Sequence, residues 1–224
     1  MVRNGQPAFE DLIIENNDAA GGRGGGVAVR SGAQVVISNS IVRNNTAHRG
    51  AGAIVVGSST RLTLNNVAIE SNTTAAGGAG ILVTDGAQLT TNGGAVHANT
   101  AQNAGGGIFF DPSTVGTINA TRLSENRGLY GGAIYARHAS VTLSHAEVTG
   151  NVANRDGGGM VVLEASTALV EDTTLANNRA ETGQGGAIVV QEAGAVLTVR
   201  RSTLRNNQSA LQAGGIRLTG VGAR

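Results

Sequence analysis

The chain has no cysteine or tryptophan and only two prolines, and aromatic residues make up 2% of its 224 residues. Without cysteine it forms no disulfide framework, thiol nucleophile or thiolate metal site. The formal net charge of +1, with arginines spread along the chain, argues against a nucleic-acid or anionic-membrane surface. No apolar run approaches the roughly 20 residues of a membrane-spanning helix. Residues 1–11 also lack the apolar core of a secretory signal.

Glycine, by contrast, is abundant, with 35 residues, and its positions reveal a repeat. Two or three small residues, usually Gly-Gly-Ala or Gly-Gly-Gly, run eight times into a short apolar strand. The first apolar residues, taken as anchors, are Val27, Ile54, Ile81, Ile108, Ile134, Met160, Ile188 and Ile216. Between residues 27 and 216 the mean interval is 27 residues. A period of this length is typical of a solenoid, propeller or array.

A second register supports the first, because an aliphatic residue is followed three positions later by asparagine once in every repeat. These asparagines are Asn17, Asn45, Asn72, Asn99, Asn126, Asn151, Asn178 and Asn207. In a coil stacked about 4.8 Å from its neighbours, identical asparagines can share amide hydrogen bonds along the axis. Asparagine also tolerates the left-handed backbone of a sharp corner. We therefore expect a structural asparagine ladder.

Within each repeat apolar residues alternate, as in Leu62-Thr63-Leu64 and Val141-Thr142-Leu143, so the pattern predicts strands and no helix. Helical arrays are thereby excluded, and a repeat of this length is too short for a propeller blade. No six-residue pattern of a left-handed helix is present. The sequence predicts an all-β, right-handed parallel β-helix with three short strands per coil of about 27 residues and about eight coils.

We expect residues 1–224 to be a single β-helix domain segment that is truncated at both ends. The first repeat begins at its second strand and the last stops within the strand Ile216-Arg217-Leu218. No polar capping element covers either terminal coil, although solenoids normally need one. Uncapped strand edges predict end-to-end self-association.

The repeat resembles a known family in its aliphatic-x-x-Asn element followed by Gly-Gly-Ala-Ile, as in Leu175–Asn178 with Gly185-Gly186-Ala187-Ile188. It is similar to the repeats of chlamydial polymorphic outer membrane proteins and of autotransporter passengers. That family usually has phenylalanine at the aliphatic position and this chain never does, so the resemblance is to the wider pectin-lyase-like β-helix group. It implies a surface-displayed or secreted bacterial protein, with adhesion as the commonest role.

The same group includes polysaccharide lyases and glycoside hydrolases, and the strands that follow the glycines carry the candidate site. If the anchors point inward, the outward column of this first sheet is Ala28, Val55, Leu82, Phe109, Tyr135, Val161, Val189 and Arg217. The rings of Phe109 and Tyr135 then stack on adjacent coils near Tyr130 and could hold a sugar. Two alternatives are that loops or another part of the parent protein cover this strip, or that the inward and outward positions are reversed.

The turn after the same strand carries charge once per coil, at Asp85, Asp111, His138, Glu164 and Glu192. Asp85 and Asp111 are the nearest carboxylate pair, and glycosidases use two carboxylates about 5 Å or about 6.5–9.5 Å apart. His138 is the candidate proton-transfer partner. The alternative interpretation is that these are solvated turn residues. Asp85, Asp111 and His138 are therefore candidates only for an enzymatic function.

Metal and cofactor sites are not predicted. The calcium-binding nonapeptide array is absent, and His48, His97, His138 and His145 lie in different coils without zinc-ligand spacing. The loop before the glycines is the most variable part of the repeat and includes His48-Arg49, Tyr130 and Asn154-Arg155-Asp156. Binding specificity in solenoids tends to lie in such loops.

The sequence leads to an adhesive or structural β-helix segment, a passenger or stalk, located extracellularly or at the outer-membrane surface. Its expected partners are carbohydrate or a host or matrix surface, with no nucleic acid and no membrane span in the segment. This hypothesis assigns no catalytic residue, and its ligand-binding candidates are Phe109, Tyr135 and Tyr130. The alternatives are a polysaccharide lyase or glycoside hydrolase, and an architectural segment without ligand. Convergence of two carboxylates and a base into one groove favours the enzyme.

Overall fold

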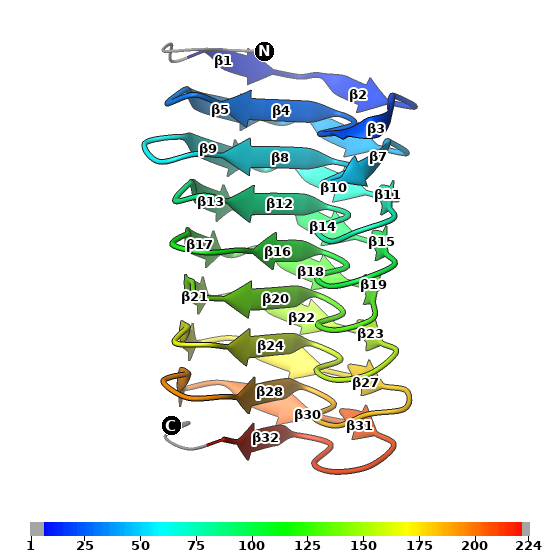
Figure 1. Ribbon diagram of the computed structural model, residues 1–224, viewed down its shortest axis with the longest axis vertical. Coiled ribbons are helices and arrows are strands. Elements are labelled where there is room, and N and C mark those ends of the chain that lie inside the picture. Colours follow the sequence, from blue (N-terminus) through cyan, green and yellow to red (C-terminus); the bar gives the residue numbers. More distant parts are fainter. Residues whose placement is uncertain (1–6, 221–224) are drawn as a thin grey trace.

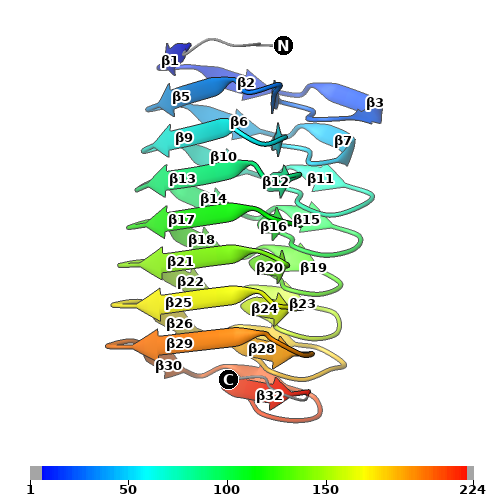
Figure 2. The ribbon, with the colours of Figure 1, turned by 60° about the vertical axis from the view of Figure 1, so that its left-hand side comes forward.

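The computed structural model describes residues 7–220, which form a solenoid of short parallel strands (Figures 1 and 2). The strands stack into four parallel sheets of eight strands each, named A to D in chain order within a coil. No segment of residues 7–220 is helical, so none of them forms a helix that is long and apolar enough to cross a membrane. The all-β parallel solenoid of about eight coils is therefore confirmed, while Met1–Gln6 and residues 221–224 of the predicted segment lie outside the described residues.

Sheets A and B carry the longer strands, four or five residues in most coils. Sheet A consists of β4 (Val27–Arg30), β8 (Ala53–Val56), β12 (Ile81–Thr84), β16 (Ile108–Phe110), β20 (Ile134–Arg137), β24 (Met160–Leu163), β28 (Ile188–Gln191) and β32 (Ile216–Thr219). Sheet B consists of β1 (Ala8–Glu10), β5 (Gln34–Ser38), β9 (Arg61–Asn65), β13 (Gln88–Asn92), β17 (Val115–Asn119), β21 (Ser140–Ser144), β25 (Thr167–Glu171) and β29 (Val196–Arg200).

Sheets C and D complete each coil with shorter strands. Sheet C consists of β2 (Ile13–Glu15), β6 (Ile41–Arg43), β10 (Ala68–Glu70), β14 (Ala95–His97), β18 (Arg122–Ser124), β22 (Glu147–Thr149), β26 (Thr174–Ala176) and β30 (Thr203–Arg205). Sheet D consists of β3 (Asp18–Arg23), β7 (Thr46–Arg49), β11 (Thr73–Thr74), β15 (Thr100–Ala101), β19 (Arg127–Gly128), β23 (Val152–Ala153), β27 (Arg179–Ala180) and β31 (Gln208–Ser209).

The coil therefore has four strands, whereas the sequence predicted three. The additional strand lies in sheet D, directly after the repeated asparagine, and in most coils it is two residues long. Two residues cannot display an alternating apolar pattern, which needs about four positions to be recognised. Its pairing comes from the coils above and below, so only the stacked structure reveals it.

The strand register corrects one anchor of the repeat. Ala53, and not Ile54, pairs with both Val27 and Ile81. Ile54 consequently belongs to the outward column of sheet A, and Val55, which was predicted to point outward, is fully buried in the core. The error arose because alanine is small and Ile54 is the first large apolar residue of that strand.

In the other coils the predicted inward orientation holds. Ile108 and Phe110 of β16 are fully buried, whereas Phe109 between them is half-buried. The core is one continuous column of apolar, mostly aliphatic side chains from sheets A, B and C, running from Val29 to Ala195. At about 25 cal/mol per Å2 of apolar surface removed from water, such stacking of coil on coil is the main stabilising contribution.

The corner between sheets C and D combines a strained residue with a buried amide. The residue in the left-handed region is the one just before the repeated asparagine, for example Asn44 (φ 53°), Ala98 (φ 52°) and Glu125 (φ 56°). The repeated asparagine itself does not have a positive φ among these residues, so the expectation that it supplies the left-handed corner is wrong. Its role is in its side chain.

The asparagine side chains form one continuous ladder from Asn17 to Asn207. In a typical step the backbone N–H and the Nδ2 of Asn72 both donate to Oδ1 of Asn99 at 3.0 Å, and Nδ2 of Asn99 donates to the Ile69 carbonyl at 2.9 Å. The same pattern links every neighbouring pair along the solenoid. The six inner members, Asn45 to Asn178, are fully buried, which is tolerated because each amide is satisfied.

Candidate functional site

Loops between sheets D and A cover most of the outward column of sheet A. Ile54, Val161 and Val189 are at most 1% exposed although they point away from the core. Glycines of the covering loops lie directly on them: a Cβ at Gly157 would collide with Val161, and one at Gly185 with Val189. Glycine is required at both positions because φ is positive and the side chain below is in contact. The apolar strip is thus mainly an additional small core.

Two aromatic rings in the middle of this column remain partly exposed. Phe109 of β16 and Tyr135 of β20 lie side by side with ring centroids 5.0 Å apart and an interplanar angle of 87°, an edge-to-face arrangement. Tyr130, from the preceding loop, lies 6.5 Å from Tyr135. Arg155 stands over the Tyr130 ring and donates to its hydroxyl at 2.9 Å. The three predicted aromatic residues therefore do converge.

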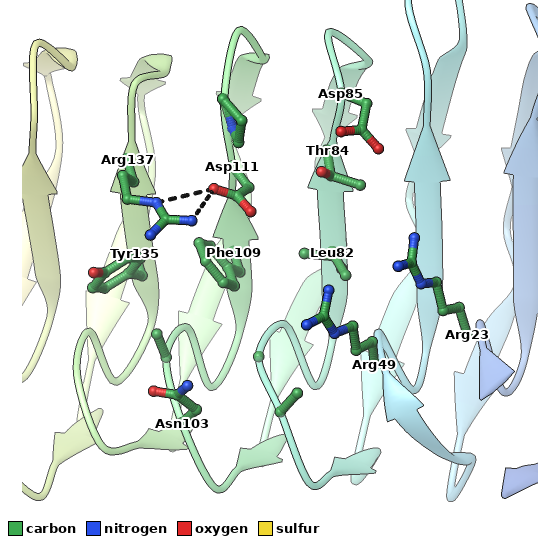
Figure 3. Close-up of a pocket in the computed structure, with 14 residues that line it drawn as sticks. Arg23, Arg49, Leu82, Thr84, Asp85, Asn103, Phe109, Asp111, Tyr135 and Arg137 are labelled. Carbon is green, nitrogen blue, oxygen red and sulfur yellow. Dashed lines mark hydrogen bonds and ion pairs between the residues drawn. The ribbon is translucent and has the colours of Figure 1, made fainter. Parts of the chain in front are cut away.

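A cavity of about 380 Å3 opens over the rings of Phe109 and Tyr135 (Figure 3). Leu82, Phe109 and Tyr135 form its floor, and Figure 3 shows Asp85 and Asp111 on the side where the strands end. On the opposite side, toward the covering loops, lie Arg23, Arg49 and Asn103. The groove therefore has an aromatic floor with an acidic rim on one side and a basic rim on the other.

One of the two carboxylates is already paired. Oδ1 of Asp111 accepts hydrogen bonds from Nη2 of Arg137 at 2.7 Å and from its Nε at 3.1 Å. This hydrogen bond, with the charge of Asp111, raises the pKa of Arg137. Burial raises the pKa of the neighbouring Tyr135 to about 12, because the phenolate is less well solvated between Phe109 and the loops.

The other charged groups of the groove are unpaired. Within residues 7–220, the side chains of Arg23, Arg49 and Asp85 have no hydrogen-bond or ion-pair partner. Arg23 and Arg49 occupy paired positions at the ends of β3 and β7, so two like charges lie on adjacent coils. Unpaired guanidinium groups beside an aromatic floor are suited to an anionic ligand, since arginine binds carboxylate, sulfate and phosphate in a bidentate manner.

The remaining charged turn residues belong elsewhere. Nε2 of His138 lies 2.8 Å from Oε2 of Glu164, one coil further, and His138 does not line the groove. Glu164 and Glu192 line a second cavity of about 300 Å3 together with Tyr130 and Tyr135. Asp85 and Asp111 thus share a groove, but the predicted base is not brought to them.

The other histidines are dispersed. His97 Nδ1 lies 3.0 Å from the Ser124 hydroxyl in sheet C, and His48 and His145 are exposed in different coils. Among residues 7–220, no three His, Cys, Asp or Glu side chains come close enough to hold a metal ion.

The basic residues of the groove were missed by the sequence reasoning, apart from a mention of Arg49 as a loop residue. A usable signal was present in the spacing, because Asp111 and Arg137 are separated by one coil of 26 residues. Opposite charges at the repeat spacing indicate ion pairs between coils. Arg23, however, is brought to the groove by an irregularity of β3 that no spacing predicts.

Comparison with known families gives one match. A family described as "right handed beta helix region" matches residues 4–153 and 99–223. No curated protein and no solved structure gives a significant match to the chain.

Proposed function

This chain belongs to the right-handed β-helix family, and on that premise we propose that it is an adhesive segment of a surface-exposed or secreted bacterial protein. It binds an anionic glycan in the groove on the outer face of sheet A. The observation that carries this proposal is the combination of the Phe109–Tyr135 platform with the unpaired Arg23 and Arg49. The long aliphatic core and the asparagine ladder supply the rigid stalk that presents the groove.

The arrangement fits a sugar chain for chemical reasons. Aromatic faces pack against the apolar C–H faces of pyranose rings, while guanidinium groups pair with uronate or sulfate groups. Because the cations are largely exposed, we expect the affinity to fall as ionic strength rises.

An enzyme of the polysaccharide lyase or glycoside hydrolase class is the second candidate. Asp85 and Asp111 in one groove favour it. Asp111 is held by Arg137 and His138 by Glu164, however, so the acid, base and substrate positions do not come together. Binding without turnover is therefore the preferred function.

The test measures binding and turnover on polygalacturonate and heparin, with dextran as the neutral control polymer. Arg23→Ala with Arg49→Ala should weaken binding to the anionic polymers by about tenfold, equivalent to about 1.4 kcal/mol. The matched control is Arg122→Ala with Arg127→Ala, which removes two exposed arginines from sheets C and D. Tyr135→Ala tests the aromatic platform.

If the two double variants lose binding equally, the interaction is a non-specific charge attraction and the groove is not the binding site. Binding of dextran at the same strength would contradict the anionic preference. Release of unsaturated or reducing ends, abolished by Asp111→Asn, would replace the adhesive function with the enzymatic one.

A further inference from the structure

The two end faces of the solenoid match one another in the same way as the facing sides of two neighbouring coils. At one end the exposed edges are β1, β2, β3 and β4, and at the other they are β29, β30, β31 and β32 (Figure 1). Among residues 7–220, each sheet thus contributes one edge strand to each face. A second copy placed end to end can continue all four sheets, because the strand order B, C, D, A is the same on both faces.

Charge in sheet B differs between these faces. The outward column that begins with Glu10 in β1 ends with Arg200 in β29, as the strand register shows. The following corner residues are Asp11 at one end and Arg201 at the other, both with a left-handed backbone (φ 54° and 48°). Stacking two copies would place each acid over an arginine.

Sheet C repeats this complementarity. The column that begins with Glu15 in β2 ends with Arg205 in β30. Among residues 7–220, the Arg205 side chain has no hydrogen-bond or ion-pair partner. One face therefore carries three carboxylates and the other carries three arginines in the matching columns.

Pairs of this kind already exist between coils of one molecule. Arg200 pairs with Glu171 at 2.7 Å, and Arg201 pairs with Asp172 at 2.9 Å, in the same two columns. These bonds lower the pKa values of Glu171 and Asp172. One coil of separation is thus the right spacing for an acid–arginine pair at this corner.

The core and the asparagine ladder also end in complementary groups. Phe9 at one face and Ile216 at the other are each 37% exposed although both lie in core columns. The first face contains an apolar cavity of about 230 Å3 lined by residues that include Phe9 and Val27. Asn17 and Asn207 are the first and last members of the ladder, so in a continued solenoid Asn207 would donate to Oδ1 of Asn17, as Asn178 donates to Asn207.

We propose that these two faces bind one another, so that copies of this chain associate head to tail into a continuous β-helix. The partner is a second copy of the chain, because its opposite face supplies the matching charge in each of three columns and the same strand register. Such a heterologous contact does not close on itself and generates linear assemblies.

Sedimentation velocity over a concentration series tests this with two charge-reversal variants. Asp11→Arg with Glu15→Arg makes both faces basic, and Arg201→Asp with Arg205→Glu makes both acidic. Each variant alone should associate at least tenfold more weakly than the parent chain. An equimolar mixture should recover association, because the altered face of one variant is complementary to the altered face of the other, and their two untouched faces are complementary as in the parent chain.

Controls separate this effect from net charge and from unfolding. Arg122→Glu with Arg127→Glu makes the same charge change as Arg201→Asp with Arg205→Glu, but in the middle of the solenoid, and should leave association unchanged. Circular dichroism checks that each variant is folded, and the single variants Glu15→Arg and Arg205→Glu provide a milder pair in case a double variant is not. A parent chain that stays monomeric, or folded variants that fail to rescue one another, would overturn the proposal.

Discussion

At the scale of single residues, each inner asparagine of the ladder holds a buried corner together. The Asn99 side chain accepts two hydrogen bonds from Asn72 and donates to the Ile69 carbonyl and to Asn126. A buried polar group left without its partner costs about 1–3 kcal/mol, more than a satisfied hydrogen bond contributes. The ladder is therefore more sensitive to deletion than its individual bonds indicate.

Asn99→Ala should lower the free energy of unfolding by about 3 kcal/mol, because it leaves the donors of Asn72 and the Ile69 carbonyl unsatisfied. Asn92→Ala in the same coil is the matched control, since Asn92 is exposed and its one amide hydrogen bond to Asn65 lies at the surface. It should cost less than about 1 kcal/mol. Urea unfolding followed by circular dichroism measures both, and equal effects would contradict the role of the ladder.

Tyr135 gives a prediction about pH. Its pKa in the folded chain is raised from 10.0 to about 12, chiefly by burial. Between these values the unfolded chain loses the phenolic proton and the folded chain keeps it, so the stability of the fold decreases as pH rises from about 10 to 12. Ultraviolet titration should show one tyrosine ionising near pH 12 and the Tyr135→Phe variant without that step. Ionisation of Tyr135 near pH 10 in the folded protein would refute the assigned burial.

At the scale of the strands, one coil has an unusually large core side chain that packs against a residue without a side chain. Phe110 of β16 is the only phenylalanine in an inward column that otherwise holds valine or alanine between Val29 and Val190. Opposite it in β17, Gly116 replaces the leucine or valine found at the paired positions of β13 and β21. A Cβ at Gly116 would collide with the Phe110 ring, so the ring fills the space that the glycine leaves.

Gly116→Val should therefore destabilise the fold by about 1–3 kcal/mol through overpacking. Adding Phe110→Val should recover most of this loss, because the double variant reproduces the combination of Val29 and Val35 at the equivalent positions of the first coil. Thermal unfolding of the two single variants and the double variant measures the coupling. Additive losses would show that the ring and the glycine do not compensate one another.

At the scale of the whole molecule, the solenoid is a sum of similar coils that contact only their neighbours. Removing residues 81–107, one complete coil, brings Gly80 to Ile108 and leaves every sheet one strand shorter but in register. We expect this variant to fold and to unfold at a temperature close to that of the parent chain. Deletion of residues 81–100 is the control, because it removes the strands of sheets A, B and C but retains the remaining loop. Circular dichroism and thermal melting distinguish the two, and equal disruption would contradict coil-by-coil stability.

The sequence alone determined the coil. Three patterns occur once in every repeat: the glycine run, the asparagine and the alternation of apolar residues. Because the repeats stack, equivalent residues of neighbouring coils lie above one another. For this reason the parallel solenoid and the inward orientation of the strands after the glycines could be derived without the structure.

The tertiary structure decided what lies outside the core. Four features depend on how loops fold back between coils. They are the two-residue strands of sheet D, the register of Ala53, the loops over sheet A, and the position of Arg23 and Arg49 in the groove that the aromatic pair also lines. Loops of changing length carry no periodic signal, since the repeat constrains only the positions that stack. The core therefore follows from periodicity, whereas the groove and the complementary end faces appear only when the coils are assembled in space.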